Sequence, residues 1–306
     1  MKKIILCLML AIFLSSCGYV TTKEQIQIPE VHKGTKGITM SFLQNMPPSE
    51  LYENKYYEAG IKIQNAGAED IRQGMLAIGV EEQQMIIEGE NNKRFDLQGK
   101  SVFNPEGTQD ILRFKIKPRA LSPKIEHYPT EITATACYIY KTEATALICI
   151  DTDIAGTIKT KPCQTRTQTF SGGQGAPVSV VSVEPKMMLH EDPTKIQPEF
   201  YITLQNAGQG NAVIQEKVYD ACSGKPLGTE SWNTVELTAR LSEQELHCRP
   251  EKIKLTKETR IVCTLNEGIE KTKGTYAAPL SIELSYGYMD RIVKNIEIKK
   301  ITTKNI

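Results

Sequence analysis

Cysteine is the residue type in this sequence whose spacing allows the most chemistry. Six of the eight cysteines lie beyond the N-terminal segment, and no two of them form a Cys-x-x-Cys pair. The four histidines are far apart in the sequence, so closely spaced zinc ligands are missing. An even number of cysteines in an exported chain predicts three disulfides instead of a metal site, and the candidates are Cys137, Cys149, Cys163, Cys222, Cys248 and Cys263.

Spacing also predicts how the first two candidates pair. Cys137 and Cys149 flank a segment that we expect to fold into a β-hairpin. With Cys137 opposite Cys149, Tyr138 faces Ile148 and the apolar residues share one face. Directly opposed residues of an antiparallel pair have Cα atoms about 4.5–5.5 Å apart, which a disulfide can bridge. The sequence therefore predicts a Cys137–Cys149 bond.

The other four candidates leave alternatives open. Cys248 and Cys263 flank two further strand-like runs, which predicts a second bridged hairpin. Cys163 and Cys222 then remain for each other. A bond between Cys222 and Cys248 is the main rival arrangement.

Several catalytic or ligand-binding motifs begin in the sequence and do not complete. The glycine-rich run 172–175 is followed by Ala176-Pro177 where a phosphate loop needs Gly-Lys-Ser/Thr. The segment 151–156 starts like a calcium loop, but Pro162 stands where a bidentate glutamate is required. No Gly-x-Ser-x-Gly elbow occurs. We therefore expect no catalytic residues, no cofactor and no metal, and a protein that is not an enzyme.

The N-terminus has the three parts of a secretory signal peptide. Met1-Lys2-Lys3 is positively charged, Ile4 to Leu14 is apolar, and two serines precede Cys17. The apolar run is shorter than the roughly 20 residues that cross a bilayer. The ending Leu14-Ser15-Ser16-Cys17 resembles the lipobox of prokaryotic lipoproteins. That resemblance implies removal of residues 1–16 and a diacylglycerol on the Cys17 thiol.

On this resemblance the mature protein is lipid-anchored on the outer face of the cytoplasmic membrane, in the cell envelope. A plain cleaved signal peptide with an ordinary Cys17 is the alternative. The net charge of +1, from 37 basic and 36 acidic residues, gives no support for nucleic-acid binding. The expected partners are the membrane, through the lipid, and a protein of the envelope or cell surface.

Apolar and polar residues alternate along most of the chain, which is typical of half-buried β-strands. Two patterns also occur twice in the same order. Gly60–Gly67 and Tyr201–Gly208 both end in Gln-Asn-Ala-Gly, and Ala134–Tyr140 matches Ile282–Tyr288. The offsets are 141 and 148 residues, so the second copy carries a short net insertion. The sequence predicts an all-β protein with two related immunoglobulin-like β-sandwiches in tandem.

The length of 306 residues agrees with two domains. The predicted boundaries are a signal peptide at 1–16, a lipid-anchored tether at 17–35, the first sandwich at 36–155, a glycine-rich linker at 156–176, the second sandwich at 177–301 and a tail at 302–306.

The Gln-Asn-Ala-Gly ending suits a chain that leaves a sheet, because Asn tolerates left-handed backbone and Gly accepts a positive φ. This strand and corner resembles the CARDB and related immunoglobulin-like modules of prokaryotic surface proteins. The resemblance implies a seven-stranded sandwich used for adhesion or spacing. The blocks Phe42–Pro48, Cys137–Asp151 and Gly172–Pro177 are similar to segments of archaeal envelope proteins, a likeness that implies no activity.

The function we expect is presentation of the two domains for protein binding or adhesion. One alternative is a structural subunit that assembles into a filament or layer through exposed strand edges. Another is a carbohydrate-binding or hydrolase-accessory module. Trp232 is the only tryptophan and is expected to be a buried anchor. Four tyrosines near prolines could form a contact surface, although core packing is their commoner use: Tyr52, Tyr56, Tyr57 and Tyr128.

Overall fold

The computed structural model describes residues 30–301, so the predicted signal peptide, Cys17 and the tail at 302–306 lie outside the described residues. The described chain is almost entirely β-structure, as the alternating pattern predicted. Its elements are β1 (Ile38–Phe42), β2 (Glu50–Tyr52), β3 (Tyr57–Asn65), β4 (Ile71–Val80), β5 (Met85–Glu88), β6 (Asn92–Leu97), β7 (Gln109–Pro118), β8 (His127–Asp151), β9 (Gln168–Thr169), β10 (Val178–Leu189), β11 (Lys195–Asn206), β12 (Asn211–Val213), η1 (Gln215–Lys217), α2 (Val218–Cys222), η2 (Thr229–Ser231), β13 (Thr234–Leu241), β14 (Gln244–Glu245), β15 (His247–Arg249), β16 (Lys252–Lys254), β17 (Thr259–Thr264), β18 (Ile269–Glu270), η3 (Lys271–Lys273) and β19 (Thr275–Lys299).

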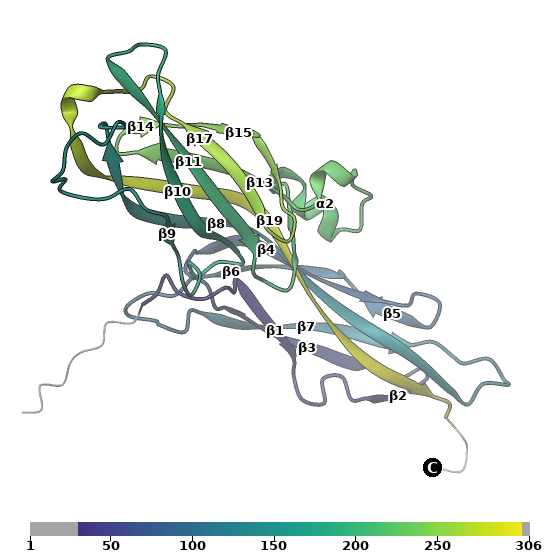
Figure 1. The fold of residues 1–306 in the computed structure, drawn as a ribbon. Coiled ribbons are helices and arrows are strands. Elements are labelled where there is room, and N and C mark those ends of the chain that lie inside the picture. Colours follow the sequence, from purple (N-terminus) through teal and green to yellow (C-terminus); the bar gives the residue numbers. More distant parts are fainter. Residues whose placement is uncertain (1–29, 302–306) are drawn as a thin grey trace, which may run out of the picture.

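Two very long strands organise the molecule. β8 and β19 are each 25 residues long, and they pair antiparallel over their whole length, from Asp151 opposite Thr275 to His127 opposite Lys299. At about 3.3 Å per residue this ribbon is roughly 80 Å long, too long for one sandwich. In Figure 1 the ribbon passes from one lobe of the molecule into the other.

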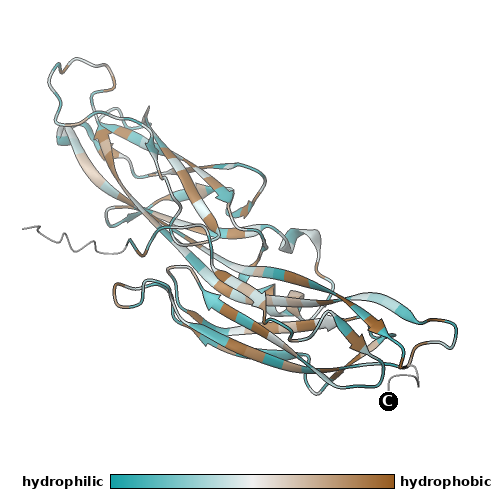
Figure 2. Ribbon diagram, turned by 90° about the horizontal axis from the view of Figure 1, so that it is seen from below, coloured by the Kyte–Doolittle hydropathy of each residue, from teal (hydrophilic) through white to brown (hydrophobic). Residues whose placement is uncertain are grey.

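Each lobe is a sandwich that uses one half of the ribbon. In lobe 1 the sheet β1-β3-β7-β5 packs on β6, β4, the first part of β8 and the last part of β19. In lobe 2 the sheet β15-β17-β11-β10-β9 packs on β13, the first part of β19 and the last part of β8. Figure 2 shows the alternating apolar and polar bands that fit strands with one buried face.

The two sequence copies are related by an approximate two-fold axis. The repeat matches Ile139 to Gly287, and these same two residues lie opposite each other in the ribbon. Each copy therefore begins its long strand in its own lobe and ends it in the other lobe, as in a dimer that exchanges a strand.

This exchange changes the predicted domain division. The chain does not divide into separate sandwiches at 156–176, because both lobes contain a strand from each half. The segment 156–176 instead returns from the end of β8 to the waist between the lobes. There Gly34 N donates to Gly172 O at 2.7 Å, and Gly175 N donates to Gly34 O at 2.8 Å. The segment 156–176 is therefore a connection that hydrogen bonds fix to the waist, and not a free linker. Residues 33–35 of the predicted tether are part of the folded body.

The disulfides follow the same topology. The structure joins Cys248 to Cys263, as expected, and it joins Cys137 to Cys222 and Cys149 to Cys163. The predicted Cys137–Cys149 and Cys163–Cys222 bonds are wrong, because β8 does not turn. Twelve strand residues at about 3.3 Å separate Cys137 from Cys149, or roughly 40 Å. Three disulfides indicate a protein of an oxidising compartment outside the cytoplasm.

Four buried tyrosines fill the waist, Tyr138 and Tyr140 from β8 and Tyr286 and Tyr288 from β19, with neighbouring ring centroids 5.6–6.4 Å apart. Their hydroxyls bond the backbone of each lobe in matching ways. Ile38 N donates to Tyr138 Oη at 3.1 Å, and its counterpart Val178 N donates to Tyr286 Oη at 3.3 Å. The tyrosines thus tie the start of each sandwich to the ribbon.

The same tyrosines explain why both Gln-Asn-Ala-Gly corners end in glycine. A Cβ at Gly67 would lie 1.9 Å from Tyr140 Oη, and one at Gly208 would lie 2.3 Å from Tyr288 Oη. Neither glycine has a positive φ, so the predicted backbone reason is wrong. Glycine is needed because a tyrosine hydroxyl approaches where a side chain would be.

Candidate functional site

The candidate site is a groove on the outer face of the ribbon sheet in lobe 1. Strand alternation points Thr133 and Thr135 of β8 to this face, opposite Gly79 and Ala77 of β4. Arg291 of β19 lies opposite Thr135 on the other side. Gly79 adds no side chain to the floor, and a Cβ there would lie only 2.6 Å from Thr133 Oγ1. We call this hollow the outer groove.

A segment from the second half of the chain roofs one end of the outer groove. Residues 214–233, between β12 and β13, contain η1, α2 and η2 and reach across to lobe 1. The Cys137–Cys222 bond fixes α2 to the sheet, and the Arg94 guanidinium lies 4.6 Å from the centre of the Tyr219 ring. This segment is the insertion that the unequal repeat offsets predicted.

The roofed part of the groove has a volume of about 510 Å³. Trp232 lies in its wall and is half-buried, so it is neither fully buried nor free in solvent. The remaining lining is apolar or uncharged, apart from Arg291: Met75, Ala77, Ile78, Gly79, Asn91, Asn92, Thr133, Thr135, Asn211, Ala221, Cys222, Ser223, Gly224 and Met289.

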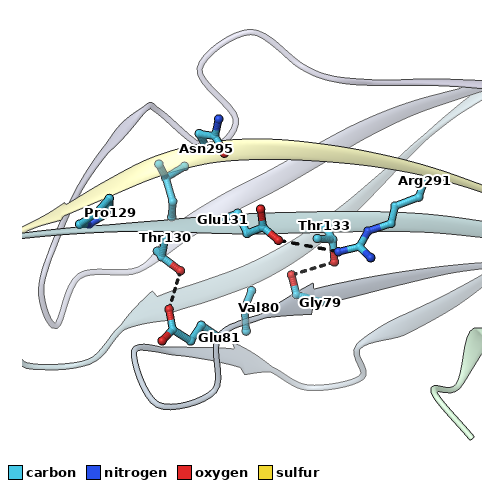
Figure 3. A pocket seen from close by; sticks show the side chains of 10 residues that line it. Gly79, Val80, Glu81, Pro129, Thr130, Glu131, Thr133, Arg291 and Asn295 are labelled. Carbon is cyan, nitrogen blue, oxygen red and sulfur yellow. Dashed lines mark hydrogen bonds and ion pairs between the residues drawn. The ribbon is translucent and has the colours of Figure 1, made fainter. Parts of the chain in front are cut away.

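The open part continues past Gly79, Thr133 and Arg291, which line both parts, and has a volume of about 630 Å³. Figure 3 shows its ion pair and hydrogen bonds. The Arg291 guanidinium lies 3.8 Å from Glu131 Oε1. Glu81 accepts a 3.0 Å hydrogen bond from the Thr130 hydroxyl at the far end.

The Tyr128 hydroxyl also bonds Glu81, at 2.8 Å, and this hydrogen bond raises the pKa of the phenol above its usual value. Tyr128 therefore supports the end of the outer groove through Glu81, and it packs partly buried against the core, which is the use that the sequence favoured. Of the other predicted tyrosines, Tyr52 and Tyr57 are half-buried and joined by a 2.7 Å bond from Tyr52 N to Tyr57 Oη. Tyr56 is 52% exposed, with two lysines against its ring.

The equivalent face of lobe 2 carries a smaller hollow of about 400 Å³, whose lining comes from β8, β13 and β19 alone. The two-fold relation places Arg240 and Thr238 of β13 where lobe 1 has Gly79 and Ala77. Glu143 takes the place of Arg291. Lys141 and Glu283 form an ion pair at 3.1 Å on this face. Gly79 and Ala77 on the floor, together with the roofing segment, therefore distinguish the groove of lobe 1 from this hollow.

The sequence predicted Trp232 as a buried anchor, whereas the structure has it half-buried in the groove wall, and the residues that surround it were not predicted. The predicted disulfide residues Cys137 and Cys222 are at the groove, because their bond fixes its roof. Arg291 and Asn92 carried no signal, since nothing in the sequence indicated that their strands share a face. The pair Thr133-x-Thr135 would have indicated the groove floor only if the register of β8 against the small residues of β4 had been known.

The rejected calcium-loop segment has a structural role. The Asp153 carboxylate accepts backbone N–H groups from Thr157 and Ile158, and these bonds hold its pKa well below the usual range. Lys161 Nζ lies 2.6 Å from Asp151 and 3.2 Å from Asp153. Within residues 30–301, no group of three or more His, Cys, Asp or Glu side chains is arranged to hold a metal ion.

No family model matches this chain, and no curated protein matches it. Three solved structures show weak likeness. The first is the secreted serine protease VesC from Vibrio cholerae, with 10% identity over 87% of this chain and 52% of that chain and a TM-score of 0.20. The second is the serine-rich repeat adhesion glycoprotein Srr1 from Streptococcus agalactiae, with 9% identity over 90% of this chain and 99% of that chain and a TM-score of 0.18. The third is the CupB6 tip adhesin from Pseudomonas aeruginosa, with 8% identity over 89% of this chain and 97% of that chain and a TM-score of 0.15.

The chain spans about half the length of the protease. Likeness at these TM-scores carries no argument about fold or activity. In the part of the chain that the structure describes, no helix has the length and apolar character needed to cross a bilayer.

Proposed function

We propose that this protein is a non-catalytic, lipid-anchored binding protein of the cell envelope that holds a surface partner in the outer groove. The observation that carries the proposal is the construction of this groove. A sheet face of lobe 1 is roofed by a segment of the second half, and the Cys137–Cys222 bond fixes the roof. A preformed concave site costs little ordering entropy when a partner binds.

Lipid anchoring is the second element of this proposal, and the lipobox-like ending at Cys17 supports it. The described chain enters the body at the waist, where Gly34 bonds to Gly172 and Gly175. Glu30 is thirteen positions after Cys17, and at about 3.3 Å per step the connection spans at most roughly 43 Å. An anchor at the waist leaves the outer faces of both lobes accessible.

Adhesion of intact cells tests the proposal. The exported form carrying Cys17→Ser is immobilised, and cells of the source organism and of its neighbours in the same habitat are passed over it. We expect retention that falls at least tenfold when Ala77→Arg fills the groove floor. Tyr56→Ala changes an exposed aromatic residue of the same lobe, away from the groove, and serves as the control. Retention that both variants leave unchanged would exclude the groove as the binding surface.

A structural subunit that assembles through strand edges is the second candidate. One observation favours it: on the side away from β8, β19 pairs with β12 up to Met289 and with β2 from Glu297, so no strand within residues 30–301 pairs with 290–296 there. Lys294 lies on the inner face of this edge, and its ammonium is 5.8 Å from the Phe42 ring centre. An inward-pointing lysine is a usual protection against edge pairing. Size-exclusion chromatography at increasing protein concentration tests this candidate. Assembly that grows with concentration and disappears when the edge 290–296 is blocked would favour a structural subunit.

A further inference from the structure

We infer that the roofed part of the outer groove binds an uncharged oligosaccharide, with Trp232 as the surface on which a sugar ring stacks. This inference rests on the proposed function, because it names the ligand class of the same groove. Four features support it: the half-buried aromatic ring, the kind of polar groups around it, the missing carboxylates and the paired backbone of the floor.

The backbone of Trp232 is held in place by its neighbours. Its backbone forms an isolated β-bridge with Val213, and its carbonyl accepts a 3.3 Å hydrogen bond from the Thr234 hydroxyl. A half-buried aromatic ring that lines the groove on a fixed backbone offers a flat apolar face at reduced entropic cost. The C–H face of a pyranose ring is the complementary surface.

The polar groups around the ring are amides and hydroxyls. Asn91, Asn92 and Asn211 each carry both donors and acceptors, and Thr135 adds a hydroxyl on the floor. Neighbouring hydroxyls of a sugar also donate and accept hydrogen bonds, so an amide side chain can bond two of them at once. The volume of about 510 Å³ lies within the range of small-ligand sites.

The charges of the lining disfavour a cationic or anionic ligand. The lining of the roofed part contains no aspartate, glutamate or lysine, and its one charged side chain, Arg291, is paired with Glu131 of the open part at 3.8 Å. A cationic ligand finds no carboxylate there. An anionic ligand would have to compete with Glu131 for the guanidinium.

An extended peptide is disfavoured by the position of the groove. Peptides that add to a sheet use unpaired backbone groups at an edge. The floor of the roofed part lies on β4 and β8, whose backbone groups already bond one another and β19. The unpaired edge 290–296 of β19 starts beside Arg291 at the margin of this part and continues along the open part. Recognition over the floor of the roofed part therefore uses side chains, which suits a sugar with many hydroxyls better than a strand.

The single tryptophan makes the inference directly measurable. Fluorescence of the exported Cys17→Ser form is followed while cellotetraose, maltotetraose, mannotetraose and tetra-N-acetylchitotetraose are added in turn. We expect at least one probe to shift the Trp232 emission saturably. Asn92→Ala should weaken that binding at least tenfold, whereas Thr238→Ala on the equivalent face of lobe 2 should leave it unchanged.

Two outcomes would overturn the inference. One is that none of the four probes gives a saturable shift. The other is that a shift is insensitive to both Asn92→Ala and Ala77→Arg, since binding would then lie elsewhere. Circular dichroism of each variant establishes that the fold is retained before binding is compared.

Periodate oxidation separates this inference from the proposed function. Periodate cleaves vicinal diols and so destroys sugar ligands on the cells used in the adhesion experiment. Retention that is lost on oxidation supports the sugar. Retention that survives oxidation but is lost in Ala77→Arg indicates a protein partner, which overturns this inference and leaves the proposed function standing.

Discussion

The hydroxyl of Tyr138 on β8 donates a 2.7 Å hydrogen bond to the carboxylate of Asp290 on β19. The two-fold relation between the sequence copies pairs this contact with the one between Tyr286 and Thr142, whose hydroxyls lie 2.8 Å apart. One half of the waist therefore holds an ionisable group where the other half holds a neutral one.

This difference predicts a pH-dependent stability. Burial raises the pKa of Asp290 from 3.8 to about 6, with the Tyr138 bond opposing the shift, and Tyr138 stays neutral because burial raises its pKa as well. A folded-state pKa above the unfolded value gives stability that is full below about pH 4 and is lost as pH rises through 6. The loss is on the order of 3 kcal/mol.

Asp290→Asn should remove that part of the pH dependence and raise stability at pH 8. Urea unfolding of both proteins between pH 4 and 8 measures it, and the difference between them isolates Asp290 from other titrating groups. Asp290→Thr, which copies the Thr142 side, should behave in the same way. Parallel pH profiles for the wild type and Asp290→Asn would contradict the prediction.

The Cys137–Cys222 bond should stabilise the protein more than the Cys149–Cys163 bond does. Their sequence separations are 85 and 14 residues, and the chain-entropy model gives about 4–5 and 3 kcal/mol. Replacing each pair by serines and measuring unfolding in urea compares them. Only the Cys137→Ser/Cys222→Ser variant should also lose the groove binding, because it alone releases α2.

Cutting the crossover should not separate the lobes. Trypsin cleavage at the exposed Arg166 leaves the ribbon and the Cys137–Cys222 bond intact, so the nicked protein should stay folded. It should run as one band without reductant and as two after reduction. The isolated fragment 177–301 should remain unfolded, because lobe 2 lacks the last part of β8. A fragment with β-type circular dichroism and cooperative unfolding would contradict the shared ribbon.

Each corner glycine should be intolerant of a side chain. Gly208→Ala places a Cβ against the Tyr288 hydroxyl and Pro177, and overpacking of this kind costs about 1–3 kcal/mol. Thermal unfolding measures the loss. Tyr288→Phe in the same chain should recover part of the lost stability, because it removes the hydroxyl. If the stability losses of Gly208→Ala and Tyr288→Phe simply add in the double variant, the close approach is not the cause.

Anchoring should depend on one thiol. Cys17→Ser should move the protein from the membrane pellet to the soluble exported fraction, because a diacylglycerol supplies two chains and stable anchoring takes two signals. Mass spectrometry of the wild-type N-terminus should find the lipid. Membrane retention of Cys17→Ser together with an unmodified wild-type N-terminus would rule the anchor out.

The sequence alone determined the local properties of this protein. Alternating residues specified strands, because period-two patterns bury one face of a sheet, and the matching Gln-Asn-Ala-Gly corners revealed two copies. The bond between Cys248 and Cys263 was also accessible, since neighbouring strands brought the two together. Each of these depends on residues that are close in sequence or repeat one pattern.

Tertiary structure alone decided which strands are partners. Between Cys137 and Cys149 the chain has no Gly, Pro or Asn, so local preference allowed β8 to continue straight. A hairpin and a long strand both bury the alternating residues, and only β19, far away in sequence, supplies the partner that selects the long strand. The same pairing creates the outer groove, because it brings β4, Arg291 and the Trp232 segment onto one face.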